Sequence, residues 1–264
     1  MIIIDVLIAV GVLLGISAVC ALILLVALRF MKVEDDETVK EIRACLPGVN
    51  CGACGYTGCD GYAAALAEGG VKTNLCIPGA DAVAEQIANI LGVEAEDVKE
   101  MYAFVHCNGN CDATEKKAEL SGVDTCRAAS TLWGGAGNCI YACIGLGDCA
   151  RKCPVGAINI VNGVALVNNA ACIGCGICED NCPNHVISLI PQTYKVAVQC
   201  SNKDKGADAM KVCKNSCIAC RKCEKTCPAD AIKVIDNVAV IDYDKCTCCG
   251  ACAKVCPRKC ISAR

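Results

Sequence analysis

Four short blocks of cysteine, each closed by Cys-Pro, constrain the fold of this chain more than any other feature. Three of the blocks share the spacing C-x2-C-x2-C-x3-C-P, and the fourth reads C-x3-C-x5-C-x3-C-P. The 264 residues include 29 cysteines but only nine aromatic side chains, so the bulky groups that usually fill a core are scarce. We therefore expect disulfides or metal centres to hold the fold together.

The spacing of the thiols favours iron–sulfur clusters over zinc. Zinc sites normally take two cysteine pairs from separate segments, not a triplet at x2 spacing. Such a triplet wraps three corners of a [4Fe–4S] cubane, and the cysteine before the proline ligates the partner cluster. Exchanging the fourth ligands in this way predicts four sites: Cys139, Cys143 and Cys149 with Cys182; Cys172, Cys175 and Cys178 with Cys153; Cys217, Cys220 and Cys223 with Cys256; and Cys246, Cys249 and Cys252 with Cys227.

An internal repeat groups these blocks into two modules. Cys153 precedes Cys172 by 19 positions, and Cys227 precedes Cys246 by the same interval. The connectors "CPVGAINIVNGVALVN" and "CPADAIKVIDNVAVID" each predict a strand, a two-residue turn and a second strand. Over about residues 139 to 264 the chain resembles, twice over, the bacterial two-[4Fe–4S] ferredoxin fold.

A fifth site is predicted nearer the N-terminus, on Cys51, Cys54, Cys59 and Cys76, with the spacing C-x2-C-x4-C-x16-C. Glycines between these cysteines let the backbone approach a bulky group. "CDGYAAALAEG" predicts a helix that ends at Gly69-Gly70, and "ADAVAEQIANILG" predicts a second helix. A zinc knuckle is the alternative interpretation. The long gap to the fourth ligand resembles the single-cluster domain of corrinoid iron–sulfur proteins.

The first thirty residues predict a membrane anchor. Val6 to Leu28 is a run of 23 residues without a charge, and a helix of that length spans about 34 Å. A cleaved signal peptide fits less well, because the run has no basic start and no small-residue cleavage site. Arg29 and Lys32 follow the run, which places the bulk of the chain in the cytoplasm and makes this a single-pass protein of the cell membrane. A reducing compartment favours metal over disulfides.

The order of these features resembles the B-subunit family of Rnf complexes. The anchor is followed by an acidic linker from Glu34 to Glu37, the motif "LPGVNCGACGYTGC" and the tandem modules. The resemblance implies an electron-transfer subunit of a membrane ferredoxin:NAD+ oxidoreductase that couples electron flow to Na+ or H+ translocation. It also implies soluble ferredoxin as donor, membrane lipid around the anchor, and partner subunits that span the membrane or bind NAD and flavin.

No complete active site is expected within the chain, because it has no G-x-G-x-x-G fingerprint for a nucleotide. No nucleic-acid partner is expected either. Two other functions stay open on the sequence alone. One is a membrane-tethered polyferredoxin that serves another acceptor, such as a complex that re-reduces a redox-sensing regulator. The other is a structural zinc protein.

These inferences predict an α+β protein with an N-terminal transmembrane helix, a small helical single-cluster domain and two tandem ferredoxin modules. The predicted segments are the anchor at 1–30, a linker and single-cluster domain at 31–104, a cysteine-containing connection at 105–138, the first ferredoxin module at 139–199, a linker at 200–216 and the second module at 217–264.

Nine cysteines lie outside the five predicted sites. Cys107, Cys111 and Cys126 could bind a sixth cluster with a fourth ligand such as Cys45, Cys200 or Cys213. Packed thiols are the alternative, and packing is also the prediction for Cys260, while Cys248 is interpreted as a spare thiol between ligands. We therefore expect five [4Fe–4S] clusters, with a sixth if the first of these alternatives holds.

Charge is distributed unevenly along the chain. Residues 31–138 carry a net charge of −9, whereas residues 195–264 carry +7. Two oxidised clusters with their thiolates would lower the latter to about +3. We hypothesise that this basic end receives an acidic ferredoxin through electrostatic steering. The alternative is that the lysines only offset the charge of their own clusters.

Overall fold

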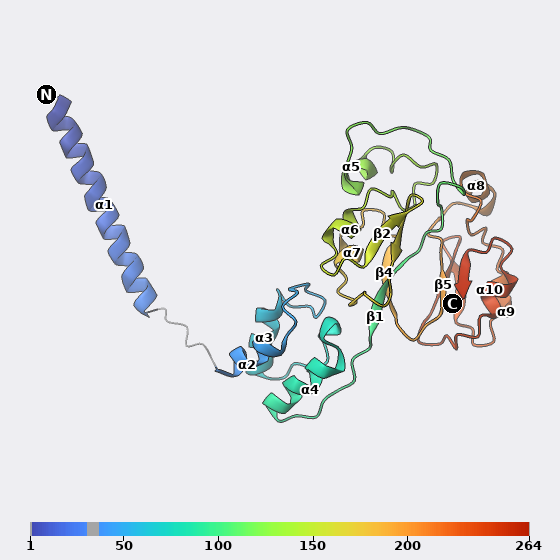
Figure 1. The fold of residues 1–264 in the computed structure, drawn as a ribbon, viewed down its shortest axis with the longest axis horizontal. Helices are drawn as coiled ribbons and strands as arrows, with labels where there is room; N and C mark the ends of the chain where they lie inside the picture. Colours follow the sequence, from blue (N-terminus) through green and yellow to red (C-terminus); the bar gives the residue numbers. More distant parts are fainter. Residues whose placement is uncertain (1, 31–36, 264) are drawn as a thin grey trace.

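The computed structural model describes residues 2–30 and 37–263, so Lys32 and the acidic residues 34–36 of the predicted linker lie outside the described part. Helix α1 runs over Ile2–Phe30 (Figure 1). Its side chains are described at positions 10, 11 and 13–26, and all of these are exposed. Across the described residues, no helix combines the length and the apolar character needed to cross a membrane.

Three helices and a short 3-10 helix form a small helical domain (Figure 1). Ile42, Tyr62, Leu66 and Ile87 are almost fully buried in its core, and each comes from one face of an amphipathic helix. Both predicted helices are confirmed, and each ends at a glycine with positive φ. The elements are α2 (Glu37–Cys45), α3 (Cys59–Glu68), η1 (Ile77–Gly79) and α4 (Ala80–Leu91).

The rest of the chain forms two modules with the same architecture. Each module has a tight β-hairpin and a second antiparallel strand pair, with short helices packed beside them. In the first module the hairpin is β2 (Ile158–Val161) with β3 (Val164–Val167), the outer pair is β1 (Met101–Val105) with β4 (Ile187–Pro191), and the helices are α5 (Cys126–Thr131), α6 (Asp148–Lys152) and α7 (Ile177–Asp180).

The second module repeats this plan. Its hairpin is β6 (Ile232–Ile235) with β7 (Val238–Ile241), its outer pair is β5 (Val196–Val198) with β8 (Ile261–Ala263), and its helices are α8 (Gly206–Val212), α9 (Lys222–Thr226) and α10 (Ala251–Val255). Each module buries its own core of small aliphatic side chains and cysteines between the hairpin, the outer pair and the helices.

The predicted hairpin turns are confirmed. Asn162 and Gly163 have φ values of 48° and 80°, and Asp236 and Asn237 have 48° and 63°. Positive φ at both central residues is the type I′ geometry, whose twist matches that of the flanking strands. Asparagine, aspartate and glycine adopt this conformation more readily than other residues, which is why the sequence reveals both turns.

The outer strand pairs move the module boundaries away from those predicted. β1 crosses the expected boundary between residues 104 and 105 and pairs with β4, so the first module begins before its first Cys-Pro block. β5 lies within the expected first module but pairs with β8 of the second. Sequence periodicity misses these pairings because each joins segments that are far apart in the chain.

Candidate metal centres

The helical domain gathers its four predicted cysteines around the start of α3 and η1. Cys59 is the first residue of α3, and Cys76 directly precedes η1. Both are buried. Burial, together with the charges of Cys59, Cys51 and Cys54, raises the pKa of Cys76 to about 11, which indicates that the four thiols lie near one another. The Oδ1 of Asn50 accepts a hydrogen bond from the Cys59 N–H and holds this loop in place.

One cavity of the first module is lined by four cysteines from three separate segments. They are Cys126 at the start of α5, Cys143 and Cys149 around the start of α6, and Cys182 after α7. Burial raises the pKa of Cys149 to about 12, and the charges of Cys143, Cys126 and Cys182 contribute. The spacing predicts Cys139 as the fourth member of this group, whereas the structure places Cys126 beside Cys143, Cys149 and Cys182.

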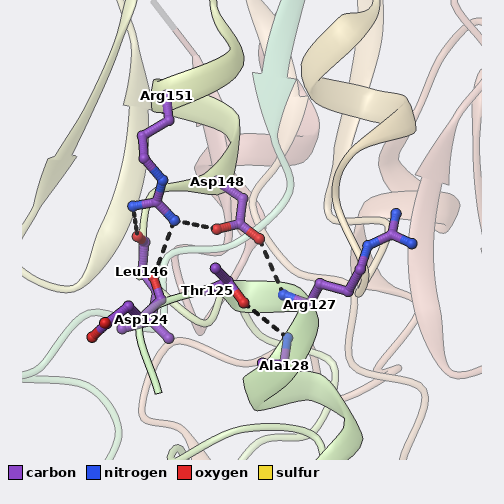
Figure 2. Close-up of polar contacts among 7 residues, drawn as sticks. All are labelled: Asp124, Thr125, Arg127, Ala128, Leu146, Asp148 and Arg151. Carbon is purple, nitrogen blue, oxygen red and sulfur yellow. Dashed lines mark hydrogen bonds and ion pairs between the residues drawn. The ribbon is translucent and has the colours of Figure 1, made fainter. Parts of the chain in front are cut away.

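A polar clamp fixes α5, and with it Cys126, against α6 (Figure 2). The Asp148 carboxylate accepts a hydrogen bond from the Arg127 N–H at 3.1 Å and pairs with the Arg151 guanidinium. Arg151 also donates to the carbonyl oxygens of Asp124 at 3.1 Å and Leu146 at 2.9 Å. Thr125 caps the helix by accepting a hydrogen bond from the Ala128 N–H. The clamp holds Cys126 in register with Cys149, which is the neighbour of Asp148.

Cys139 lies in a different cavity, which it lines together with Cys107, Cys200 and Cys213. The predicted trio for a sixth site is not assembled: Cys126 lines the cavity of the first module, and Cys111 is exposed near the hairpin turn at Gly163. Cys45 is also elsewhere, since its thiol donates to the Glu41 carbonyl within α2. The structure therefore does not bring Cys107, Cys111 and Cys126 together.

The second group of thiols in the first module lies around Cys175. Burial raises the pKa of Cys175, and the charges of Cys51, Cys153 and Cys172 raise it further. Cys178 responds in the same way, because burial and the charges of Cys172 and Cys175 raise its pKa to about 12. Cys153, which ends the preceding Cys-Pro block, therefore lies beside the following triplet.

The second module also gathers its cysteines into two groups. One cavity is lined by Cys217, Cys220, Cys223 and Cys256. Burial raises the pKa of Cys246. The backbone hydrogen bond from Cys248 lowers this pKa, whereas the charges of Cys248 and Cys227 raise it, and the net shift is upward. Burial raises the pKa of Cys252 as well, with contributions from Cys246 and Cys227. Cys249 is exposed at the surface of the module.

Cys260 is a fifth sulfur beside the first of these groups. It is buried, and its Sγ lies 3.5 Å from the Sγ of Cys256. A hydrogen bond donated by the Cys260 thiol lowers the pKa of Cys217 to about 6, and the same bond raises the pKa of Cys260. This interaction favours the thiolate of Cys217, which is the metal-binding form.

Donors around the sulfurs fit cubane clusters. Backbone N–H groups donate to the Sγ of Cys172 from Ala103, of Cys153 from Ala157 and of Cys227 from Ala231, at 3.3–3.4 Å. Such bonds stabilise the negative charge of an iron–sulfur centre. The buried Nε of Arg258 has no hydrogen-bond partner among the described residues, and Arg258 lines the cavity of Cys217 and Cys256, where a cluster sulfide could accept from it.

Single metal ions fit less well. In the described part of the chain, no three histidine, cysteine or acidic side chains converge closely enough to bind one ion. A cubane does not require such convergence, because each of its four thiolates binds a different iron.

Comparisons with known proteins find iron–sulfur families over parts of the chain. A family model described as "Putative Fe-S cluster" matches residues 46–78, and two described as "4Fe-4S dicluster domain" match residues 138–187 and 171–231. The B subunit of the Na+-translocating ferredoxin:NAD+ oxidoreductase complex of Acetobacterium woodii is 40% identical over 97% of this chain and 78% of its own length. The B subunit of the proton-translocating complex of Clostridium ljungdahlii is 43% identical over 86% of this chain and 81% of its own length.

The B subunit of the ion-translocating oxidoreductase complex of Methanosarcina acetivorans is 38% identical, with 97% of both chains covered. This chain belongs to the Rnf B-subunit family. The family resemblance indicated by its motifs is thereby confirmed. As an Rnf protein, the chain carries an Fe–S domain within its helical domain and 4Fe–4S domains over residues 138–231, which cover parts of both modules.

Several residues that shape the centres of this Rnf protein were not predicted from its sequence. Asp148, Arg151 and Arg258 sit one or two positions from a cysteine, but their partners come from distant loops. Asn202 is 2% exposed and donates to the Sγ of Cys139 at 3.4 Å, and it lies in a segment that looked like a charged linker. The sequence signal that could have indicated this role is the position of Asn202, two residues after Cys200, a cysteine outside the five predicted sites.

Proposed function

We propose that this Rnf protein accepts electrons from reduced soluble ferredoxin and passes them through a series of [4Fe–4S] clusters to partner subunits of an ion-translocating ferredoxin:NAD+ oxidoreductase complex. The relatives whose names specify this reaction align with nearly the whole chain or with most of it. A bound cluster supplies a centre that gains and loses one electron without making or breaking bonds to a substrate. No catalytic group is needed in this chain.

The grouping of the thiols supports five ligand sets. Four keep the predicted membership, that of the helical domain among them, and one replaces Cys139 by Cys126. The proposed sets are Cys51, Cys54, Cys59 and Cys76; Cys126, Cys143, Cys149 and Cys182; Cys153, Cys172, Cys175 and Cys178; Cys217, Cys220, Cys223 and Cys256; and Cys227, Cys246, Cys249 and Cys252.

The observation that carries the proposal is the contact between successive sets. A side chain at Gly174 would collide with the carbonyl oxygen of Met101 and lie 2.9 Å from the side chain of Ile77, the residue after Cys76. The helical domain is therefore packed directly onto the loop that holds Cys172 and Cys175. Within the first module the Cys149 charge also contributes to the raised pKa of Cys178. Adjacent sets are what a relay of single electrons requires.

The residues around the thiols exclude water from the sites and stabilise the negative charge of the thiolates. The modules bury cysteines among alanine, valine and isoleucine side chains, which exclude water. Backbone N–H groups point at the sulfurs and stabilise the thiolate state. Because these donors are fixed by strands and helix ends, little rearrangement is needed when the charge of a site changes.

We also propose that α1 anchors the chain in the cell membrane with the modules on the cytoplasmic side. The 23-residue uncharged run supports this, as do exposed apolar side chains such as Leu13 at 64% and Leu24 at 63%. Water is a poor environment for a helix with this composition. Deletion of residues 1–30 should move the protein from the membrane fraction to the soluble fraction. Retention of the shortened chain on membranes depleted of partner subunits would contradict the anchor.

Anaerobic purification of the full chain tests the function. We expect a brown protein whose visible absorbance is bleached by reduced ferredoxin and whose reduced form gives paramagnetic resonance signals of [4Fe–4S] centres. A colourless preparation with stoichiometric zinc would overturn the proposal. So would clusters that dithionite reduces but ferredoxin does not.

A further inference from the structure

We propose that Cys107, Cys139, Cys200 and Cys213 bind a sixth [4Fe–4S] cluster between the two ferredoxin modules. This inference rests on the proposed iron–sulfur function, but it concerns thiols outside the five sets above. The four cysteines follow β1, precede α6, follow β5 and follow α8, respectively, and they line one cavity. Cys139 and Cys213 are buried, and Cys107 and Cys200 are half-buried.

The loop at Gly109 lies against the sulfurs of two of these cysteines. A Cβ at Gly109 would lie 3.5 Å from the Sγ of Cys107 and 3.6 Å from the Sγ of Cys213. A side chain there would therefore enter the space that these two sulfurs share. The Gly109 N–H also donates to the Cys107 Sγ at 3.4 Å. Both observations place the backbone of this loop against a sulfur-lined space.

The sulfurs of this cavity receive the same kind of hydrogen bonds as those of the other sites. The Cys143 N–H donates to the Sγ of Cys107 at 3.4 Å, and the Cys217 N–H donates to the Sγ of Cys200 at 3.2 Å. The buried Nδ2 of Asn202 donates to the Sγ of Cys139 at 3.4 Å. A thiol is a weak acceptor for a buried amide, whereas an iron-bound thiolate is a strong one. Three buried N–H donors directed at sulfur are therefore better matched by iron-bound thiolates than by packed, metal-free thiols.

The walls of the cavity are fixed by contacts between the two modules. The side chain of Asn215 donates to the Asn108 carbonyl at 2.9 Å, and the Thr114 hydroxyl donates to the Val212 carbonyl at 2.7 Å. The imidazole of His106 bridges the Val198 carbonyl and the Ser188 hydroxyl at 2.7 and 2.6 Å. Segments from both modules thus present the four cysteines in one arrangement, as a preorganised site requires.

The position of the cavity gives the cluster a role in electron transfer. Cys143, whose N–H contacts Cys107, belongs to a ligand set of the first module, and Cys217, whose N–H contacts Cys200, belongs to one of the second. An electron from the reduced second-module cluster would reduce the sixth cluster by one electron and then pass to the first module. No proton or covalent bond changes hands. The proposed relay becomes continuous across the interface between the modules.

Iron and acid-labile sulfide analysis of the anaerobic full chain tests the proposal. We expect about twenty-four of each per chain, and about twenty in Cys139→Ser and Cys213→Ser. The matched control is Cys111→Ser, because Cys111 is exposed and lines none of these cavities, and it should keep about twenty-four. A reductive titration should likewise fall from about six electrons per chain to about five.

A second variant separates cluster loss from misfolding. Asn202→Leu removes the amide donor but no thiol, so it should keep all the iron and lower the midpoint potential of one cluster only. The proposal is overturned if the full chain holds about twenty irons and Cys213→Ser holds the same, or if the loss in Cys213→Ser is of zinc. It is equally overturned if Asn202→Leu leaves every potential unchanged. A chain without iron would instead refute the underlying function.

Discussion

The backbone N–H of Cys217 donates a hydrogen bond to the Sγ of Cys200 across 3.2 Å. Cys217 opens the first cysteine triplet of the second module, whereas Cys200 follows β5 and belongs to a cavity shared with the first module. The peptide that carries one ligand therefore also stabilises charge on a sulfur of the neighbouring site. A change of charge at either site should be felt at the other, so the two sites form one coupled pair.

Cys126→Ser should remove one cluster from the first module, because Cys126 lines a cavity with Cys143, Cys149 and Cys182. Iron analysis should show a loss of about four irons per chain, and paramagnetic resonance should show the loss of one reduced signal. Cys111→Ser is the control and should lose none. Full iron content in Cys126→Ser, together with its loss in Cys182→Ser, would show that the cluster takes its fourth ligand elsewhere.

Asp148→Ala should loosen the clamp that holds α5 against α6 (Figure 2). Loss of these bonds should cost about 1–2 kcal/mol, or a roughly five- to thirtyfold faster release of the cluster beside Cys126. The measurement is the decay of visible absorbance in a chelator. Asp208→Ala removes a similar but exposed pair with Lys211 on α8 and should leave the decay unchanged. Equal effects of the two variants would argue against the clamp.

Release of clusters by a chelator should accelerate as pH falls from about 8.5 to about 6. Burial raises the pKa of Cys143 to about 11 and that of Cys149 to about 12, above the ordinary value of 9.0. A raised pKa stabilises the metal-free fold below about pH 9, and this contribution is lost as pH rises through about 11 to 12. In the range tested these metal-free thiols stay protonated, so each thiolate that leaves iron takes up a proton.

The pH dependence of cluster release should also differ between the two modules. The hydrogen bond from Cys260 lowers the pKa of Cys217 to about 6, so this thiol ionises within the range tested and protons compete less with iron there. We expect the cluster at Cys217 to be released with a weaker pH dependence than the cluster at Cys149. The decay of each paramagnetic signal at a series of pH values measures this. Release that does not vary with pH at either site would contradict the prediction.

Reduction by an acidic ferredoxin should slow as ionic strength rises, because residues 195–264 carry a net charge of +7 before their clusters are counted. The double variant Lys222→Glu and Lys225→Glu reverses two exposed charges on α9 and should lower the bimolecular rate severalfold at low salt. Lys152→Glu, on the equivalent helix of the first module, is the control. A stopped-flow rate that is unchanged by salt would remove the steering hypothesis.

The sequence predicts the local elements well because their signals are local. The turn at Asn162 and Gly163 and the helix that ends at Gly69 each follow from neighbouring residues. The outer strand pairs and the boundaries they set could not be predicted in this way. β1 is only five residues long, and nothing in its own pattern indicates β4 as its partner.

The distribution of the remaining thiols was also beyond sequence reasoning. Cys139 stands four positions before Cys143 and looks like the opening of its motif, yet the two line different cavities. Cys126 lies farther away in the chain but is carried to Cys149 by the clamp on α5. Spacing describes which thiols a short loop can present together, whereas these groups depend on contacts between distant segments.

The pairing of β5 with β8 has a consequence for how the protein is made. β5 opens the second module and β8 follows its last Cys-Pro block, so the module cannot close until the ribosome has released residues 261–263. During synthesis the thiols after residue 200 therefore wait unprotected, while the helical domain can already be complete. Maturation factors that deliver iron and sulfide would therefore meet this half of the chain after the helical domain.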